Sequence, residues 1–248
     1  MSVRQGHPVN GLLAACLLVA TTWGCSAEFP EHAPPVIVIH GLGRTTASMA
    51  ILSARLADAG FRVTSFGYPS RTEPVEALID RLADQVDQCC HDDMTGVHFV
   101  THSMGGVLVR SYLSRRPERH DGRVVMLSPP SQGSEIVDAF VDSEMLRALL
   151  GPAGARLGTG SAGIAGELPP VQFSLGIITG SRSLSPLGSW LIPGPDDGKV
   201  GVDRARLDGA TDFLILPATH TFIMNRRDVA DEVVHFLQHG QFRSPETR

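Results

Sequence analysis

The chain has 248 residues, of which 42% are hydrophobic and 19% are charged. This length and composition are typical of one large globular domain and exclude a disordered chain. The net charge is −5, and the sequence contains no long basic run, so nucleic acid is not an expected partner. The sequence also lacks zinc-spaced CxxC pairs and a phosphate-binding GxxxxGK(S/T) loop.

The first 27 residues have the features of an export signal. Arg4 precedes an apolar run, "GLLAACLLVATT", at residues 11–22. This run is shorter than the roughly 20 residues that a membrane-spanning helix needs. Its length and flanks are typical of a secretory signal. We therefore expect an exported protein that is secreted, periplasmic or anchored to the membrane.

The site of cleavage within this signal stays open. "TWGC" resembles a bacterial lipobox, in which Cys25 would be lipidated and become the new N-terminus, and the protein would then associate with a membrane. "LAAC", ending at Cys16, matches the lipobox better but leaves almost no apolar run before it. "CSA", ending at Ala27, would serve as an ordinary cleavage site. In each case residues 28–248 form the expected domain.

Strands and helices alternate along that domain. Short apolar or β-branched runs predict strands at residues 36–40, 61–68, 97–102, 122–130, 171–180 and 212–220. Apolar residues at helical spacing predict helices at residues 47–60, 74–90, 105–116, 134–150 and 228–240. This alternation predicts an α/β fold with a mostly parallel sheet and helices on both faces.

Two segments depart from this pattern. Residues 128–170 contain no expected strand, and their second half, "GPAGARLGTGSAGIAGELPP", has the composition of a flexible loop. Long insertions in compact domains are usually functional or disordered, so residues 131–170 are interpreted as a possible cap or lid. Cys89 and Cys90 follow each other at a predicted helix end. Because neighbouring cysteines seldom bond, we expect a helix end and a polar loop there, with an intermolecular or a labile disulfide as the alternative.

Ser103 is the candidate nucleophile. It follows the strand "VHFVTH" and precedes the helix "GGVLVRSYL", so it sits at a sharp strand-to-helix turn. This is the context of a nucleophile elbow, which needs small residues two before and two after the serine. Gly105 meets this requirement, whereas Thr101 replaces the usual glycine and is expected to fit tightly.

A serine hydroxyl needs a base, and the base needs an orienting acid, which in this topology follow in the order Ser, Asp or Glu, His. Among the later histidines, His220 directly follows an expected strand, whereas His120, His235 and His239 do not. We therefore predict His220 as the base. The acid should follow the preceding strand, where "PGPDDGKV" offers Asp197 first and Asp196 second. The less favoured carboxylates are Asp203, Asp208 and Asp212.

The oxyanion of an acyl intermediate needs two backbone N–H donors. Met104, directly after the candidate nucleophile, would supply one, and Leu42 in the glycine-rich loop "HGLGR" would supply the other. His40 and His102, which flank these positions, are interpreted as structural.

The ordered pieces "VIVIHGLGR", "FVTHSMGG", "SPPSQGSE", "PDDGKV" and "PATHTFIM" resemble the α/β-hydrolase superfamily, in particular bacterial lipases and esterases such as the small Bacillus-type lipases. The resemblance implies a catalytic triad of Ser103, Asp197 and His220, with Leu42 and Met104 as oxyanion donors. It also implies that no metal or organic cofactor is required.

These observations predict a serine carboxylic-ester hydrolase that acts on a small-molecule or lipid ester. Two alternatives remain. An acyltransferase would use the same residues, and a non-catalytic envelope protein would retain only the fold.

Overall fold

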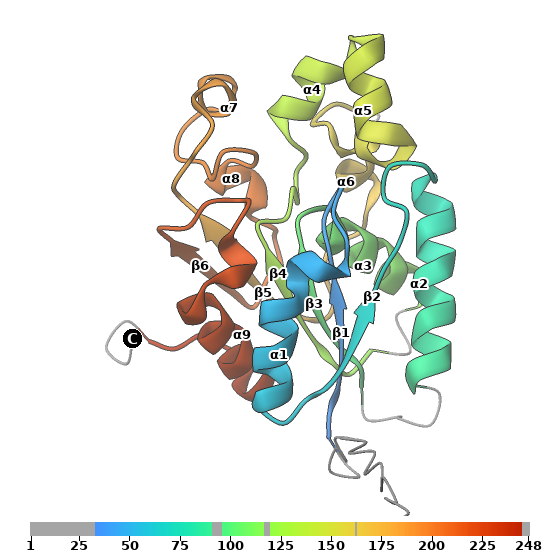
Figure 1. Cartoon of the computed structure of the whole chain (residues 1–248), viewed down its shortest axis with the longest axis vertical. Coiled ribbons are helices and arrows are strands. Elements are labelled where there is room, and N and C mark those ends of the chain that lie inside the picture. The colour runs from blue at the N-terminus through green and yellow to red at the C-terminus, as the bar shows by residue number, and fades with distance from the viewer. Residues whose placement is uncertain (1–32, 91–95, 117–119, 162, 245–248) are drawn as a thin grey trace, which may run out of the picture.

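The structure is a computed structural model, and it describes residues 33–90, 96–116, 120–161 and 163–244. Its centre is a six-stranded sheet in the order β2-β1-β3-β4-β5-β6, in which every neighbouring pair is parallel (Figure 1). The strands are β1 (Pro35–Ile39), β2 (Arg62–Phe66), β3 (His98–His102), β4 (Arg123–Leu127), β5 (Ser174–Gly180) and β6 (Asp212–Leu216). Each of the six strands predicted from the sequence is present, and the predicted parallel sheet is confirmed.

Four long helices cover the two faces of the sheet. They are α1 (Ala50–Asp58), which extends the short η1 (Thr46–Met49), α2 (Val75–Cys90), α3 (Met104–Arg115) and α9 (Arg227–His239). Helices α1 and α9 lie on one face, and α2 and α3 lie on the other (Figure 1). All four were predicted from the sequence to within two or three residues.

The alternation of side chains along β1 explains this layering. Its five residues are all buried. Val36 and Val38 belong to the core formed with α1 and α9, whereas Ile37 and Ile39 belong to the core formed with α2 and α3. Successive residues of a strand point to opposite faces, so a central strand between two helix layers must be apolar throughout.

The segment between β4 and β5 lies over the carboxyl edge of the sheet (Figure 1). It carries α4 (Glu135–Val141), α5 (Glu144–Gly154), η3 (Ala155–Leu157) and α6 (Ile164–Glu167). Its second half was predicted to be a loose loop, and this prediction was wrong. Leu157 and Ile164 are buried in the core, which fixes this glycine-rich stretch as short helical turns.

Three short helical segments complete the carboxyl edge. They are α7 (Pro186–Leu191), α8 (Val202–Ala205) and η4 (Ile223–Asn225). All three belong to loops that follow β5 or β6. The side chains predicted to do chemistry therefore gather at this edge, where parallel α/β sheets bind their ligands.

Two further features concern the chain ends and the cysteines. The predicted export signal, with Cys25, lies outside the described residues. Within the described residues, no helix is long and apolar enough to cross a membrane. Helix α2 ends at Cys90 as predicted, but Cys90 is joined to Cys89 by a disulfide, which the sequence did not favour.

Candidate active site

Ser103 occupies a strained turn between β3 and α3. Its φ of 53° and ψ of −123° lie in a region that L-residues rarely adopt. The turn is held by the Ser103 N–H, which donates to the Leu127 carbonyl at 2.9 Å, and by the Gly106 N–H, which donates to the Ser103 carbonyl at 2.9 Å. Strain of this kind persists only where the surroundings fix it, and it concentrates at functional sites.

The structure shows how the elbow accommodates Thr101. This residue is fully buried in β3. A Cβ added at Gly106 would lie 3.2 Å from the Thr101 Oγ1, and one added at Gly105 would lie 2.9 Å from the His40 carbonyl oxygen. Gly106 therefore leaves room for the Thr101 side chain, and Gly105 lets the start of α3 approach the end of β1.

Ser103, His220 and Asp197 form one hydrogen-bonded line. The Ser103 Oγ lies 3.1 Å from the His220 Nε2, and the His220 Nδ1 lies 2.9 Å from the Asp197 Oδ2. His220 and Asp197 are both buried, at 4% and 1% exposure, so water does not screen their interaction. In this geometry the hydroxyl donates to Nε2, and the Nδ1–H donates to the carboxylate.

The two adjacent aspartates have different environments. The Asp197 Oδ1 accepts hydrogen bonds from the N–H groups of Lys199 and Val200, at 3.0 and 2.9 Å. Burial alone would raise the pKa of Asp197, but the charge and hydrogen bond of His220 outweigh burial and hold that pKa below its usual value. Asp196 instead accepts from the Gly198 N–H and the Ser189 hydroxyl, at 2.7 and 2.9 Å, and shapes the loop.

His102 fixes the backbone of His220 by a hydrogen bond. Its Nε2 lies 3.0 Å from the His220 carbonyl oxygen, so Nε2 carries the proton and donates. Burial is the main cause that lowers the pKa of His102 well below its usual range, and the nearby His220, Arg44 and Lys199 lower it further. His102 is therefore a neutral support, as the sequence indicated.

The loop after β1 approaches the elbow closely. A Cβ added at Gly41 would lie 2.8 Å from the His102 Nδ1 and 3.0 Å from the Ser103 Cβ. His40 supports this loop, because its Nδ1 lies 2.9 Å from the Gly41 carbonyl oxygen and its ring stacks on Tyr68 at 4.3 Å.

The two predicted oxyanion donors lie on either side of this contact. Leu42 follows Gly41 in the loop, and Met104 is the first residue of α3. Among the hydrogen bonds of the described residues, neither the Leu42 N–H nor the Met104 N–H has an acceptor. Both amides are therefore available to an incoming oxygen.

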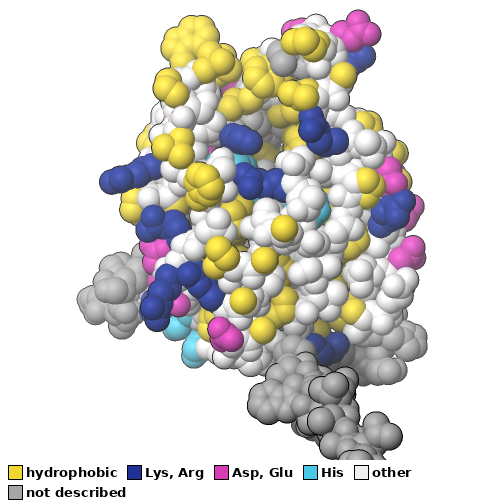
Figure 2. All heavy atoms as spheres, in the orientation of Figure 1, with side chains coloured by type: hydrophobic (Ala, Val, Ile, Leu, Met, Phe, Trp, Pro, Cys, Tyr) yellow, Lys and Arg dark blue, Asp and Glu magenta, His cyan; other side chains and the backbone are white. Residues whose placement is uncertain are grey.

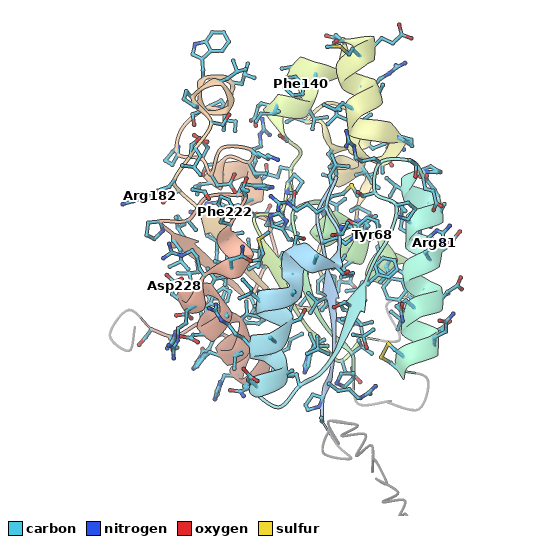
Figure 3. All side chains as sticks on the ribbon, in the orientation of Figure 1. Tyr68, Arg81, Phe140, Arg182, Phe222 and Asp228 are labelled. Carbon is cyan, nitrogen blue, oxygen red and sulfur yellow. A yellow bond between two sulfur atoms is a disulfide. The ribbon has the colours of Figure 1, made fainter. Side chains whose placement is uncertain are left out.

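A pocket of about 300 Å³ opens beside Ser103 and His220. One part of its lining is apolar and comes from the loop after β1, the segment between β4 and β5, and α7. These residues are Leu42, Ile136, Val137, Phe140, Leu150, Leu157, Leu187 and Leu191. Figure 3 labels Phe140 on α4. The lining also contains two cationic residues, Arg44 and Lys199, which the sequence analysis did not single out.

The three later histidines that the sequence did not favour as the base lie away from the line. His120 packs between Phe99 and Phe173, and burial lowers its pKa to about 4. His235 and His239 stack on each other on α9. Among the described residues, no group of three or more His, Cys, Asp or Glu side chains is arranged to hold a metal ion.

Sequence comparison identifies a related family over about half of the chain. Residues 35–153 match the model of the palmitoyl protein thioesterase family. This match includes β1, the elbow and most of α5, but it ends before Asp197 and His220. No curated protein sequence matches the chain.

Several solved structures with the same architecture are lipolytic enzymes. Bacillus licheniformis lipase BlEst2 in its mature form has a TM-score of 0.67 and 21% identity, over 80% of this chain and 89% of that one. Phospholipase PlaB from Legionella pneumophila has a TM-score of 0.68 and 16% identity, over 84% of this chain and 60% of that one. A structure of the metagenome-derived lipolytic enzymes LipS and LipT has a TM-score of 0.59 and 17% identity, over 82% and 93% of the two chains.

The parallel sheet, the strained elbow and these structural relatives define the class of the protein. The chain has the α/β-hydrolase fold, and the resemblance to bacterial lipases and esterases that its motifs indicated is confirmed.

Proposed function

We propose that the protein is a serine carboxylic-ester hydrolase in which Ser103, His220 and Asp197 are the catalytic triad. The observation that carries this proposal is the continuous line of two hydrogen bonds, 3.1 and 2.9 Å long, that ends at the mouth of an apolar pocket. A structural serine needs neither a buried histidine and aspartate in line nor a strained backbone. The histidine and aspartate activate a serine nucleophile, and the strained turn exposes it in a nucleophile elbow.

The reaction proceeds in two acyl transfers. Ser103 Oγ attacks the ester carbonyl carbon while His220 Nε2 takes the hydroxyl proton, and Asp197 stabilises the imidazolium that forms. His220 then gives this proton to the leaving oxygen as the carbonyl–oxygen bond breaks. A water molecule next attacks the acyl-serine with His220 again as the base, and the acid is released as the Ser103 hydroxyl is restored.

The N–H groups of Leu42 and Met104 are the proposed oxyanion hole. Both lie next to Ser103 and have no acceptor among the described residues. Met104 also begins α3, where the unpaired N–H groups of the first helical turn favour negative charge. Donors that are already in place when the negative charge develops lower the barrier without reorganisation.

The surroundings of the pocket favour a substrate with an acyl chain. Hydrophobic side chains project at two places beside the pocket, over α7 and over α4 and α5 (Figure 2). Trp190 and Leu187 on α7 are 80% and 64% exposed, and Met145 and Leu149 on α5 are 76% and 59% exposed. Exposed apolar patches of this kind mark interaction sites, so residues 131–170 are proposed to act as a cap that receives a lipid ester.

The family match favours a thioester as a second candidate for the bond that the protein cleaves. The matched family is described as a palmitoyl protein thioesterase, and a triad of this kind cleaves thioesters by the same two steps. Parallel assays on an oxygen ester and a thioester with the same acyl chain would identify the preferred bond.

The location of the protein stays as predicted from the sequence. We propose that it is exported and works at or outside a membrane, with Cys25 as the residue that lipidation would modify. Solved structures that share its fold include a membrane phospholipase A, at 15% identity and a TM-score of 0.55.

Hydrolysis of p-nitrophenyl esters of increasing chain length tests the proposal. The purified protein should release p-nitrophenol, with a preference for chains longer than acetate, and Ser103→Ala should abolish this release. If an added alcohol received most of the acyl groups, the protein would be an acyltransferase and not a hydrolase. A well-folded protein without activity on any ester would contradict the proposal.

A further inference from the structure

The pocket beside the proposed triad has walls of two kinds. The residues from α4, α5 and α7 are apolar and suit an acyl chain. Arg44, in the loop after β1, and Lys199, in the loop after β5, bring two positive charges to the same lining. Lys and Arg side chains are visible between the two hydrophobic projections in Figure 2. A neutral lipid ester makes no use of such charges.

Two other arginines at the carboxyl edge have carboxylate partners. Arg204 pairs with Glu135 at 2.6 Å, and Arg156 pairs with Glu167 at 2.8 Å. Among the described residues, the side chains of Arg44 and Lys199 form no ion pair and no hydrogen bond. Two unpaired cations at the mouth of a pocket attract an anion.

The two cations line the same pocket as Ser103 and His220. Partial burial first and the charge of Arg44 second lower the pKa of Lys199, against the opposing charge of Asp197, although the Lys199 side chain reaches solvent. Both charges also act on His102, next to Ser103. The carboxylate whose charge acts on Lys199, Asp197, is already engaged by His220 and by two backbone N–H groups. A bound anion would relieve this repulsion.

The backbone holds Lys199 in place independently of its ammonium group. The Lys199 N–H donates to Asp197 at 3.0 Å, and its carbonyl accepts from the Ser134 hydroxyl at 3.0 Å. Because these bonds use main-chain atoms, a substitution of the side chain removes the charge and leaves the loop intact.

We propose that the substrate is an acyl ester or thioester whose leaving group carries a phosphate, which Arg44 and Lys199 bind while the acyl chain lies in the apolar part of the pocket. This inference rests on the proposed function and specifies its substrate class. The phosphate can belong to a phospholipid headgroup or to coenzyme A, and both present it on the alcohol or thiol half of the molecule.

Two substrate pairs separate these sources. Dioctanoylglycerol phosphate and dioctanoylglycerol, in mixed micelles, differ by a headgroup phosphate. Octanoyl-coenzyme A and the octanoyl thioester of N-acetylcysteamine differ by the phosphates of coenzyme A. For each pair, the measured quantity is the ratio of kcat/KM for the phosphate-bearing member to kcat/KM for the neutral member.

Arg44→Gln and Lys199→Gln should each lower this ratio about tenfold in at least one pair, which corresponds to one charge-assisted hydrogen bond. Arg182→Gln is the matched control, since Arg182 is exposed, has no carboxylate partner among the described residues and does not line the pocket (Figure 3). This control should leave both ratios unchanged. Arg44→Lys should retain most of the preference.

The salt dependence of this ratio tests the inference on the unmodified protein, without a variant that must fold. Raising NaCl from about 0.02 M to about 0.5 M should lower the ratio, because salt screens exposed charges. If the kcat/KM ratio falls in the glycerolipid pair alone, the phosphate belongs to a phospholipid headgroup. If the ratio falls in the thioester pair alone, the phosphate belongs to coenzyme A. Ratios that stay within twofold in both pairs, with all members hydrolysed, would overturn the inference. No hydrolysis of any member would contradict the proposed function itself.

Discussion

Replacing Asp197 with asparagine tests the proposed acid directly. The Asp197 carboxylate uses Oδ1 for the N–H groups of Lys199 and Val200 and Oδ2 for the Nδ1–H of His220. Asparagine has one oxygen and one amide nitrogen. If its oxygen keeps the two backbone donors, its NH₂ faces His220 and donates to Nδ1. His220 then carries its proton on Nε2 and cannot accept the proton of Ser103.

The expected loss follows from this change of tautomer. A triad whose histidine is held in the wrong tautomer loses about 10⁴-fold in kcat, or about 5 kcal/mol of transition-state stabilisation. We therefore expect Asp197→Asn to lower kcat/KM on a p-nitrophenyl ester by about 10⁴-fold, with little change in circular dichroism. Steady-state kinetics with freshly purified variant measures this loss.

Asp196→Asn is the matched control. Asp196 lies one residue away and is also buried, but it bonds Gly198 and Ser189 and does not reach His220. Its substitution should lower kcat/KM by less than about tenfold, because only the loop loses support. If Asp197→Asn retained activity within tenfold of the unmodified protein, or if Asp196→Asn lost as much, the assignment of the acid would be refuted.

Two further predictions concern stability. A Cβ at Gly106 would lie 3.0 Å from the Met126 Sδ and 3.2 Å from both the Pro129 Cβ and the Thr101 Oγ1, so Gly106→Ala should lower the free energy of unfolding by about 1–3 kcal/mol, as urea denaturation would show. An unchanged free energy of unfolding would contradict this crowding. The His98 Nδ1 accepts from the Arg123 N–H at 2.8 Å, and burial first and the Arg123 charge second lower the pKa of His98 to about 4. As the pH falls from about 6.5 to about 4, the unfolded chain therefore binds a proton that the folded chain does not. The free energy of unfolding should decrease by at most about 3 kcal/mol as the pH is lowered through this range. His98→Asn keeps an acceptor and should flatten the pH dependence in thermal denaturation, whereas an unchanged slope would contradict this cause.

The regular part of the fold was accessible from the sequence because its signals are local. Strand β1 is a continuous apolar run, and α2 and α9 have apolar residues at helical spacing. Buried parallel strands and amphipathic helices produce such patterns directly. Short helices do not, and α7 and α8 have six and four residues, which is too few to establish a period.

The segment between β4 and β5 shows a different limit of sequence reasoning. Its glycines were interpreted as a sign of a loose loop, but several of them allow close backbone contacts. A Cβ at Gly133 would lie 2.4 Å from the Gly158 carbonyl oxygen, and one at Gly151 would lie 1.9 Å from the Arg71 carbonyl oxygen. The sequence signals for close packing and for flexibility are the same here, because glycine serves both.

The candidate site was partly accessible for a related reason. Ser103, Asp197 and His220 follow strands in a fixed order, so the topology places them together. Arg44 and Lys199 have no such signal, because each resembles an ordinary surface charge in its own loop. Only the folded chain shows that both line the pocket and that neither has a carboxylate partner among the described residues.

The central claim is that Ser103 is an activated nucleophile. Incubation with a fluorophosphonate that carries an alkyl chain, followed by mass spectrometry of the peptides, tests this claim most directly. We expect one phosphonate adduct, located on Ser103, whose formation is slowed by Asp197→Asn and abolished by His220→Ala. A folded protein that stays unlabelled, or an adduct on a different serine, would contradict the account.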